Sequence, residues 1–452
     1  MSVALAYKLE THFGNEGLMS SSACGRMGQS FRGGALIAIL FFLSPLLTAA
    51  APRLSPFFLP IIGLTLIVAA LRRGLDWRQL LKPNAALIAL VVVALYACLS
   101  TAWAANPGGA IAKSSILLAA TFVVFAATAA MATLDEGEIR RASIAFVAGA
   151  LCAAGVVTIE LLSDGALTRM TMNTISAFKP ERAKHMTIES GMVTKINLSE
   201  FNQHVAILAL QLWPGLLALR ALPGRRRVLL IILFFAALAV PIGLSEHDSS
   251  QVALLASLLV LPLAWSWPRA VMRGLAVAWC LGFVLVLPLD FLVYKAELHQ
   301  AQWLPSSARA RIIIWEFTAE RVLEHPWLGI GADSTPAVKA RSEAQPEWPK
   351  GFVFRRTTGQ HAHNLFLQVW YELGLAGVIL VALAGAAVVL RIPLLAAEVQ
   401  PYATASFVMF AVMATFAWGI WQIWLICAFA LLPLYLGMAA APFRGHARSR
   451  PS

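Results

Sequence analysis

The sequence predicts an all-α fold: a polytopic integral membrane protein with about 12 transmembrane helices and one sizeable loop subdomain on the outer side. Of its 452 residues, 59% are hydrophobic and 13% are charged, whereas soluble domains are roughly 45–50% apolar and about 25% charged. Apolar runs of helical length follow one another along the chain. Basic residues gather in every second connection between these runs, which is typical of cytoplasmic loops.

The positions of the spans follow from the thickness of a bilayer. A hydrocarbon core of about 30 Å requires roughly 20 apolar residues per helix. Runs of this kind predict twelve spans, at 34–51, 54–71, 84–104, 111–132, 142–163, 201–219, 228–245, 250–267, 271–293, 363–390, 402–420 and 422–440.

These spans divide the chain into five parts. Residues 1–33 are rich in Gly and Ser and are predicted to be a disordered cytoplasmic tail, and 34–293 hold helices 1–9 with an outer loop at 164–200. Residues 294–362 are too long to remain a structureless loop and predict the outer subdomain. Helices 10–12 occupy 363–440, and 441–452 form a basic cytoplasmic tail.

The distribution of charge predicts the orientation. With both termini cytoplasmic, the inner segments hold 19 Lys and Arg residues, and the short outer turns hold only Arg53 and Lys113. The net charge of +12 then reflects membrane topology. We therefore expect membrane lipids as partners and no nucleic acid.

The outer subdomain contains one predicted helix, over 308–323. Ile312, Ile313 and Trp315 alternate there with charged residues, as in a short helix that lies against the membrane. Pro326 ends it, and Gly329-Ile-Gly331 predicts a tight turn. Trp315 is assigned a structural polar role.

A polar stripe opens the tenth span. Asn364, Gln368 and Glu372 recur every four residues and would share one helix face, with His363 at its outer end. Such a stripe cannot face lipid, so Asn364 and Gln368 are candidates for substrate binding. Glu372 is either a functional ionisable group or, as we favour, a hydrogen-bonded packing anchor.

His363 is the candidate general base. A histidine at a water-facing helix entrance is mostly neutral at pH 7 and can accept a proton, although it could also only cap the helix. His361 is a candidate for substrate binding. The two histidines are two residues apart and no suitable carboxylate or cysteine accompanies them, so we predict no metal site.

Further outer polar residues are candidates for binding an anionic substrate. Arginine is well suited to phosphate because its planar guanidinium makes paired, charge-assisted hydrogen bonds. Asn202 lies at the outer end of the sixth span and Gln251 near that of the eighth, although such groups could equally be satisfied interfacial residues. The substrate-binding candidates of this group are Arg309, Arg311, Arg355, Arg356, Asn202 and Gln251.

Several of these residues form motifs in a recognisable order. They are Arg311-Ile-Ile-Ile-Trp315, then His325-Pro326-Trp327-Leu328-Gly329-Ile-Gly331, then His363-Asn364-Leu365-Phe366-Leu367-Gln368 with Glu372-Leu373-Gly374. In order, spacing and side of the membrane this combination resembles the O-antigen ligase and O-antigen polymerase superfamily of bacterial inner-membrane enzymes. The resemblance is specific over 305–390.

The resemblance implies transfer of a glycan from undecaprenyl diphosphate to a hydroxyl acceptor at the periplasmic face, without a metal or another cofactor. It implies that His363 is the base and that Arg311 contacts the diphosphate. The family often has a Ser-Arg pattern where this chain has Ser250-Gln251. Arg309, Arg355 or Arg356 would then supply the second cation.

Three functions remain open at this stage. A ligase would transfer the polysaccharide to the lipid A core, whereas a polymerase would join lipid-linked repeat units. We favour the ligase. A polysaccharide-lipid transporter is a more remote alternative. Transporters typically carry charge pairs at mid-membrane depth and broken helices in pseudo-symmetric halves, whereas the conspicuous polar groups of this chain lie at the outer boundary of the membrane.

Overall fold

The structure is a computed structural model that describes residues 21–175, 186–338, 358–416 and 418–448. Each of the twelve predicted spans overlaps one long helix. These helices are α1 (Ser21–Ala50), α2 (Ser55–Arg72), α4 (Ala85–Leu99), α5 (Pro107–Ala130), α6 (Glu136–Leu162), α8 (Asn202–Arg220), α9 (Arg226–Leu244), α10 (Asp248–Ser266), α11 (Pro268–Lys295), α13 (Leu365–Val389), α14 (Gln400–Phe416) and α15 (Ile423–Ala440).

Within the described residues, nine of these helices are long and apolar enough to cross a membrane. They are α2, α4, α5, α6, α9, α10, α11, α13 and α15. The apolar part of α1, Gly34–Ala50, is shorter than the others. A polytopic helical membrane protein is therefore confirmed, and the count of twelve spans stays a prediction.

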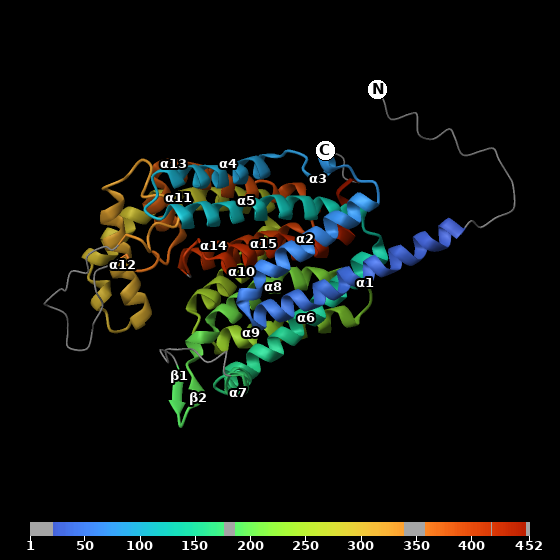
Figure 1. Cartoon of the computed structure of the whole chain (residues 1–452), viewed down its shortest axis with the longest axis horizontal. Helices are drawn as coiled ribbons and strands as arrows, with labels where there is room; N and C mark the ends of the chain where they lie inside the picture. Colours follow the sequence, from blue (N-terminus) through green and yellow to red (C-terminus); the bar gives the residue numbers. More distant parts are fainter. Residues whose placement is uncertain (1–20, 176–185, 339–357, 417, 449–452) are drawn as a thin grey trace.

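Two helices form the centre of the bundle (Figure 1). In α8 every residue from Val205 to Leu219 is buried, as in a core helix that is apolar on all sides. α15 packs against α8, α2, α5 and α6. Its Tyr435 stacks on Phe146 of α6 with the ring centroids 4.6 Å apart.

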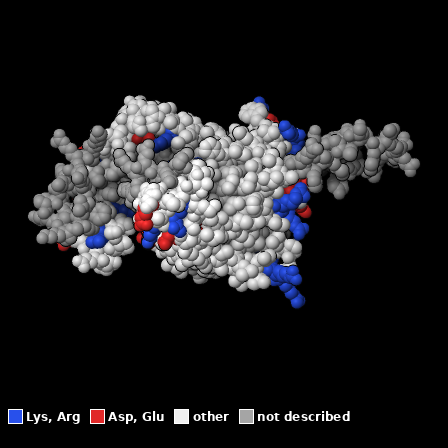
Figure 2. All heavy atoms as spheres, turned by 60° about the horizontal axis from the view of Figure 1, so that its bottom comes forward, with Lys and Arg blue, Asp and Glu red and all other residues white. Residues whose placement is uncertain are grey.

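One end of the bundle is strongly basic. Lys and Arg gather there in Figure 2, at the opposite end from α12 (Ser306–Val322). An ion pair between an exposed arginine and a buried glutamate links two helices at this end, because Arg73 after α2 lies 2.6 Å from Glu138 at the start of α6. Asp135 caps α6 by accepting a hydrogen bond from the Glu138 amide (2.7 Å).

The structure differs from the predicted domains at the N-terminal tail and in the outer loop at 164–200. α1 begins at Ser21, so the prediction of a disordered tail over 1–33 is wrong from Ser21 onward. The outer loop at 164–200 contains α7 (Ala166–Thr174) and an antiparallel hairpin of β1 (Met186–Glu189) and β2 (Met192–Ile196), so the all-α prediction missed two strands. The other short helices are η1 (Pro52–Leu54), α3 (Trp77–Leu80), η2 (Ser100–Ala102), η3 (Met131–Thr133), η5 (Leu198–Phe201), η6 (Leu298–Gln300), η7 (Ile392–Leu394) and η8 (Ala441–Arg448).

The helix predicted over 308–323 is confirmed as α12, which ends at Val322 ahead of Pro326. It buries Ile313 and Phe317 and packs against α11 and α13. This position places α12 beyond the ends of the long helices in Figure 1.

The span predicted at 363–390 is not one continuous helix. α13 begins at Leu365 and is interrupted at Gly374, whose φ of 61° and ψ of −167° are not helical. The residues 326–331 lie across this interruption and replace the missing helical hydrogen bonds. The four bonds are Ile330 N–H to Tyr371 O (3.1 Å), Gly331 N–H to Glu372 O (2.8 Å), Leu375 N–H to Pro326 O (2.8 Å) and Ala376 N–H to Trp327 O (3.2 Å).

The predicted turn at Gly329 and Gly331 makes this insertion possible. Both glycines have positive φ, and a Cβ on Gly329 would lie 2.4 Å from the carbonyl carbon of Glu372. A Cβ on Gly374 would lie 2.4 Å from the carbonyl carbon of Trp327. The two backbones therefore touch where a side chain cannot fit. Non-helical backbone at membrane depth is tolerated when it is buried in protein and hydrogen-bonded in this way.

We predict that Gly374→Ala destabilises the protein by at least about 2 kcal/mol, because a β-carbon adds both a steric clash and backbone strain. The thermal unfolding midpoint of the purified protein in detergent measures this effect. Gly155→Ala in α6 is the matched control, since a Cβ there would meet nothing within 4 Å. Equal midpoints for the two variants would show that the interruption of α13 is not a strict requirement.

Candidate active site

The candidate site lies at the α12 end of the bundle, where the segment before α13 meets α12. The Trp315 indole N–H donates to the Ala362 carbonyl (2.9 Å). This bond fixes the histidine-containing segment 361–363 beside the helix that carries Arg311. Trp315 thus links the first and last motifs that the sequence analysis singled out.

The two histidines lie side by side, with their ring centroids 4.0 Å apart. His363 has a φ of 53°, and α13 begins only at Leu365. His363 therefore lies next to the outer end of the helical stripe but not within the helix, because the chain turns at His363 before the helix starts. The turn allows both rings to lie at the same site.

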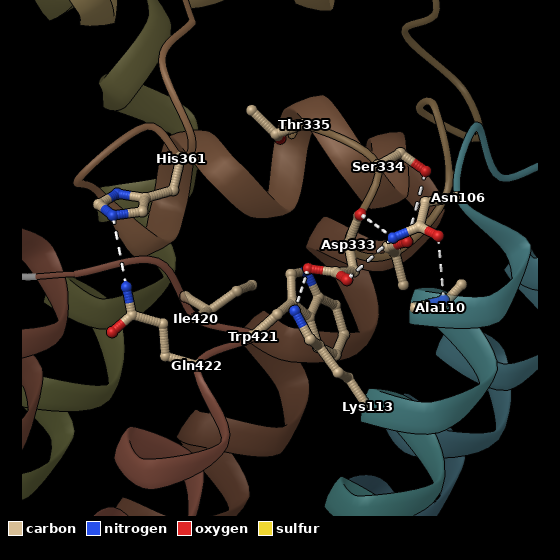
Figure 3. Close-up of polar contacts among 12 residues, drawn as sticks. Asn106, Ala110, Lys113, Asp333, Ser334, Thr335, His361, Ile420, Trp421 and Gln422 are labelled. Carbon is tan, nitrogen blue, oxygen red and sulfur yellow. Dashed lines mark hydrogen bonds and ion pairs between the residues drawn. The ribbon is translucent and has the colours of Figure 1, made fainter. Parts of the chain in front are cut away.

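His361 is held by the connection between α14 and α15. Its Nε2 lies 3.5 Å from Nε2 of Gln422, and Figure 3 shows the two side chains pointing toward each other. Gln422 Oε1 accepts a hydrogen bond from Trp424 (2.7 Å), which orients the amide N–H toward the histidine. Gly419 makes room for the ring, because a Cβ at Gly419 would lie 2.7 Å from His361 Cβ.

Arg311 is a partly buried cation facing several titratable groups. Burial lowers its pKa, and the carboxylate of Asp248 acts in the opposite direction. Within the described chain no hydrogen bond or ion pair holds the guanidinium.

His247, at the start of α10, completes this group. Its Nδ1 lies 2.6 Å from Ser250 Oγ, and its ring stacks on Trp418 at 4.8 Å. Burial and the charge of Arg311 lower its pKa to about 3. Burial, His363 and Arg311 lower the pKa of His361, also to about 3. Among the described residues, the cation Arg311 therefore lies near two imidazoles, those of His247 and His361, that are neutral at physiological pH.

The remaining predicted residues have other places in the structure. Asn364 caps α13 by accepting from the amides of Phe366 (3.0 Å) and Leu367 (3.3 Å). Gln251 donates to the carbonyls that end α9, including that of Ser245 (2.8 Å). The contacts that place these two side chains are thus helix-end contacts.

Asn202 lies on α8 and Arg309 on α12, and the other two arginines lie outside the described residues. Asn202 is the first residue of α8, and its Oδ1 is buried without a hydrogen-bond partner. Arg309 is partly buried on α12. It lies two residues before Arg311, so the two side chains leave the helix in different directions. Arg355 and Arg356 lie outside the described residues.

Gln368 and Glu372 belong to a buried polar network beneath the site. Gln368 Oε1 accepts from the amide of Ile420 (3.1 Å), and its Nε2 donates to Glu372 (3.4 Å). The Glu372 carboxylate also accepts from the indole of Trp421 and from the amide (3.1 Å) and hydroxyl (2.5 Å) of Thr335. These bonds tie the 333–335 turn and the α14–α15 connection to α13.

Asp333 extends the network to α5, as Figure 3 shows. Its carboxylate lies 2.7 Å from Lys113 Nζ and accepts from Asn106 Nδ2 (3.3 Å). Lys113, one of the two basic residues of the predicted outer turns, is thus paired with a buried carboxylate. The histidine segment and the turns after α12 are therefore both anchored to the bundle.

Sequence reasoning did not assign His247, Asp248, Trp418 and Gln422 to the site. A polar run at 246–251 was visible in the sequence, but nothing there connects it to Arg311. Gln422 sits in a short connection between two apolar runs, and only the packing of α14 and α15 brings it to His361. Among the described residues, no group of three His, Cys, Asp or Glu side chains could hold a metal ion.

We predict that His361 makes folding stability depend on pH. Its pKa of about 3 in the folded protein lies below the ordinary value of 6.5, so the unfolded chain binds the extra proton between these values. This contribution to stability is complete above pH 6.5 and is lost as the pH falls toward 3. The unfolding midpoint of the wild type, measured from pH 7.5 down to pH 4.5, should therefore fall more steeply than that of His361→Gln.

The exposed His325 provides the control for this prediction. The His325→Gln variant should follow the wild-type pH dependence. A His361→Gln protein with an unchanged slope would contradict the assignment of a buried, neutral His361.

Comparison with known proteins agrees with the location of this site. Residues 231–382 match the model of a family described as O-antigen ligase, a range that contains His247, Asp248, Arg311 and both histidines before α13. A curated protein of Rickettsia conorii named "Putative polysaccharide ligase" is 24% identical over 237 residues, which are 52% of this chain and 51% of the relative. The match thus spans about half the length of that relative. The resemblance to the O-antigen ligase superfamily is confirmed by these findings.

Proposed function

We propose that this chain, which resembles the O-antigen ligase superfamily, is a glycosyltransferase that moves a polysaccharide from undecaprenyl diphosphate to a hydroxyl of the lipid A core. The observation that carries the proposal is the grouping of Arg311 with His361 and His363 at the α12 end of the bundle. A cation next to two imidazoles suits a reaction in which a hydroxyl loses a proton and an anionic group leaves.

In the proposed reaction His363 takes the proton of the acceptor hydroxyl. The acceptor oxygen forms a bond to the anomeric carbon while the bond from that carbon to the diphosphate oxygen breaks. The diphosphate leaves with the electron pair, and Arg311 stabilises its developing charge. A single displacement of this kind inverts the anomeric configuration. The neutral His361 can lie beside His363 without opposing its protonation by charge.

The diphosphate itself is a good leaving group, so the proposal assigns no metal or other cofactor to the step. The donor's polyprenyl chain would remain in the bilayer, and the acceptor would approach from the aqueous side. Arg309, and Arg355 and Arg356 outside the described residues, stay candidates for a second phosphate contact.

The proposed location is the bacterial inner membrane with the site in the periplasm and both termini in the cytoplasm. The basic end of the bundle supports this orientation, because positively charged connections are retained on the cytoplasmic side. The α12 end then faces the periplasm, where lipid-linked polysaccharides and the lipid A core are both accessible.

The proposal predicts that His363→Ala and Arg311→Gln each reduce transfer by at least about 10²-fold, since a general base typically contributes 10²–10⁴ in rate. The measurement is the surface-glycan profile on a gel, with the gene deleted in the parent organism and each variant restored. His325→Ala and Arg321→Gln are matched controls, because His325 is exposed and Arg321 lies farther along α12, paired with Glu324.

The deletion profile also separates the alternatives. Bare lipid A core with polymer accumulated on its lipid carrier is the result expected for a ligase. Core bearing a single repeat unit would identify a polymerase. Full rescue by His363→Ala would remove His363 from the mechanism, and net movement of the lipid-linked glycan in liposomes by that variant would favour a transporter.

A further inference from the structure

A cavity lies at the basic end of the bundle, at the ends of α5, α13 and α15 that are opposite the candidate site. Its volume is about 790 Å³, within the range of roughly 300–1,000 Å³ that is usual for ligand sites. It is bordered by the α3–α4 connection, the last turns of α5, the segment after α13 and the end of α15.

Three cations border this cavity and come from three separate segments. Lys82 precedes α4, Arg391 follows α13 and Arg444 follows α15. The residues that line the cavity include no Asp or Glu, so no carboxylate of the lining neutralises these charges. Arginine and lysine converging without a counter-ion favour an anionic ligand, and phosphate matches the guanidinium geometry best.

The rest of the lining is largely apolar. Phe125, Ala129, Val399 and Gly437 are among the residues that form this apolar wall. Leu394, only three residues after Arg391, exposes 69% of its surface. A soluble anion would make no favourable contact with this apolar surface. A lipid would place its headgroup on the cations and its chains along the leucines.

We infer that this cavity binds an anionic glycerophospholipid, with the phosphate held by Lys82, Arg391 and Arg444 and the acyl chains along the apolar wall. The inference does not depend on the proposed transferase activity, because it concerns the end of the bundle opposite α12, the helix that carries Arg311. A bound lipid would hold together three segments that are distant in the sequence.

The test uses the full-length protein purified in detergent and titrated with phosphatidylglycerol or phosphatidylcholine, with bound lipid counted by native mass spectrometry. The wild type should prefer phosphatidylglycerol by at least about tenfold, as three basic contacts would provide. The Lys82→Gln/Arg391→Gln/Arg444→Gln variant should lose this preference. The single variant Arg391→Gln should lose part of it and serves if the triple variant does not fold.

The control is Arg140→Gln/Arg226→Gln/Arg269→Gln, which removes the same charge from exposed positions at the same end, outside the cavity. This control should bind phosphatidylglycerol within about twofold of the wild type. Equal binding by the cavity triple variant and the wild type, or equal losses in both triple variants, would overturn the site. Displacement of the lipid by millimolar inorganic phosphate would show a soluble phosphate site and overturn the lipid assignment.

Discussion

The arrangement of the candidate site depends on the interruption of α13 at Gly374. A continuous helix would use its own carbonyls at Tyr371 and Glu372, whereas here these carbonyls accept hydrogen bonds from the residues after α12. The segment 326–331 thereby becomes part of the bundle although it belongs to no helix. Its position determines where α12 lies and, with α12, where Arg311 lies relative to the segment 361–363.

The polar groups below the site serve this same insertion. Glu372 accepts hydrogen bonds from the turn at Thr335, from Gln368 and from Trp421. Replacing water by this many donors is what allows a carboxylate to remain buried. The network at the α12 end thus divides into two layers: a structural layer around the fully buried Glu372, and a partly buried layer of Arg311, His361 and His363, the proposed substrate site.

Much of the helical architecture follows from apolar runs, because a bilayer requires helices of a nearly constant length. The helix over 308–323 and the glycine turn that follows it were also visible as local patterns. The break in α13 was not visible in this way, because a glycine such as Gly374 among apolar residues is common in an uninterrupted membrane helix. Its partner segment lies more than forty residues earlier in the chain.

The site was predictable to the extent that its residues occur in local motifs. The helix with Arg311 and Trp315 of the first motif lies beside the segment that ends at His363, the first residue of the last motif, although His363 precedes the helix in a left-handed turn. Gln422 and His247 could not be found in this way, because packing between distant helices places them there. Asn364 is the converse case. It belongs to the last motif and was a candidate for substrate binding, but its side chain caps its own helix.

The network around Glu372 has a consequence for how the protein is made. Translation proceeds from the N-terminus, so Thr335 and Asp333 already exist when Glu372 leaves the ribosome. Trp421 follows only 49 residues later, together with the connection that carries Ile420 and Gln422. Until α14 and α15 have been inserted, the Glu372 carboxyl group lacks its hydrogen bond from Trp421. The histidine segment before α13 likewise lacks its contact with Gln422. The last two helices therefore complete the site, and a nascent chain that ends before them has the residues for the reaction without the arrangement.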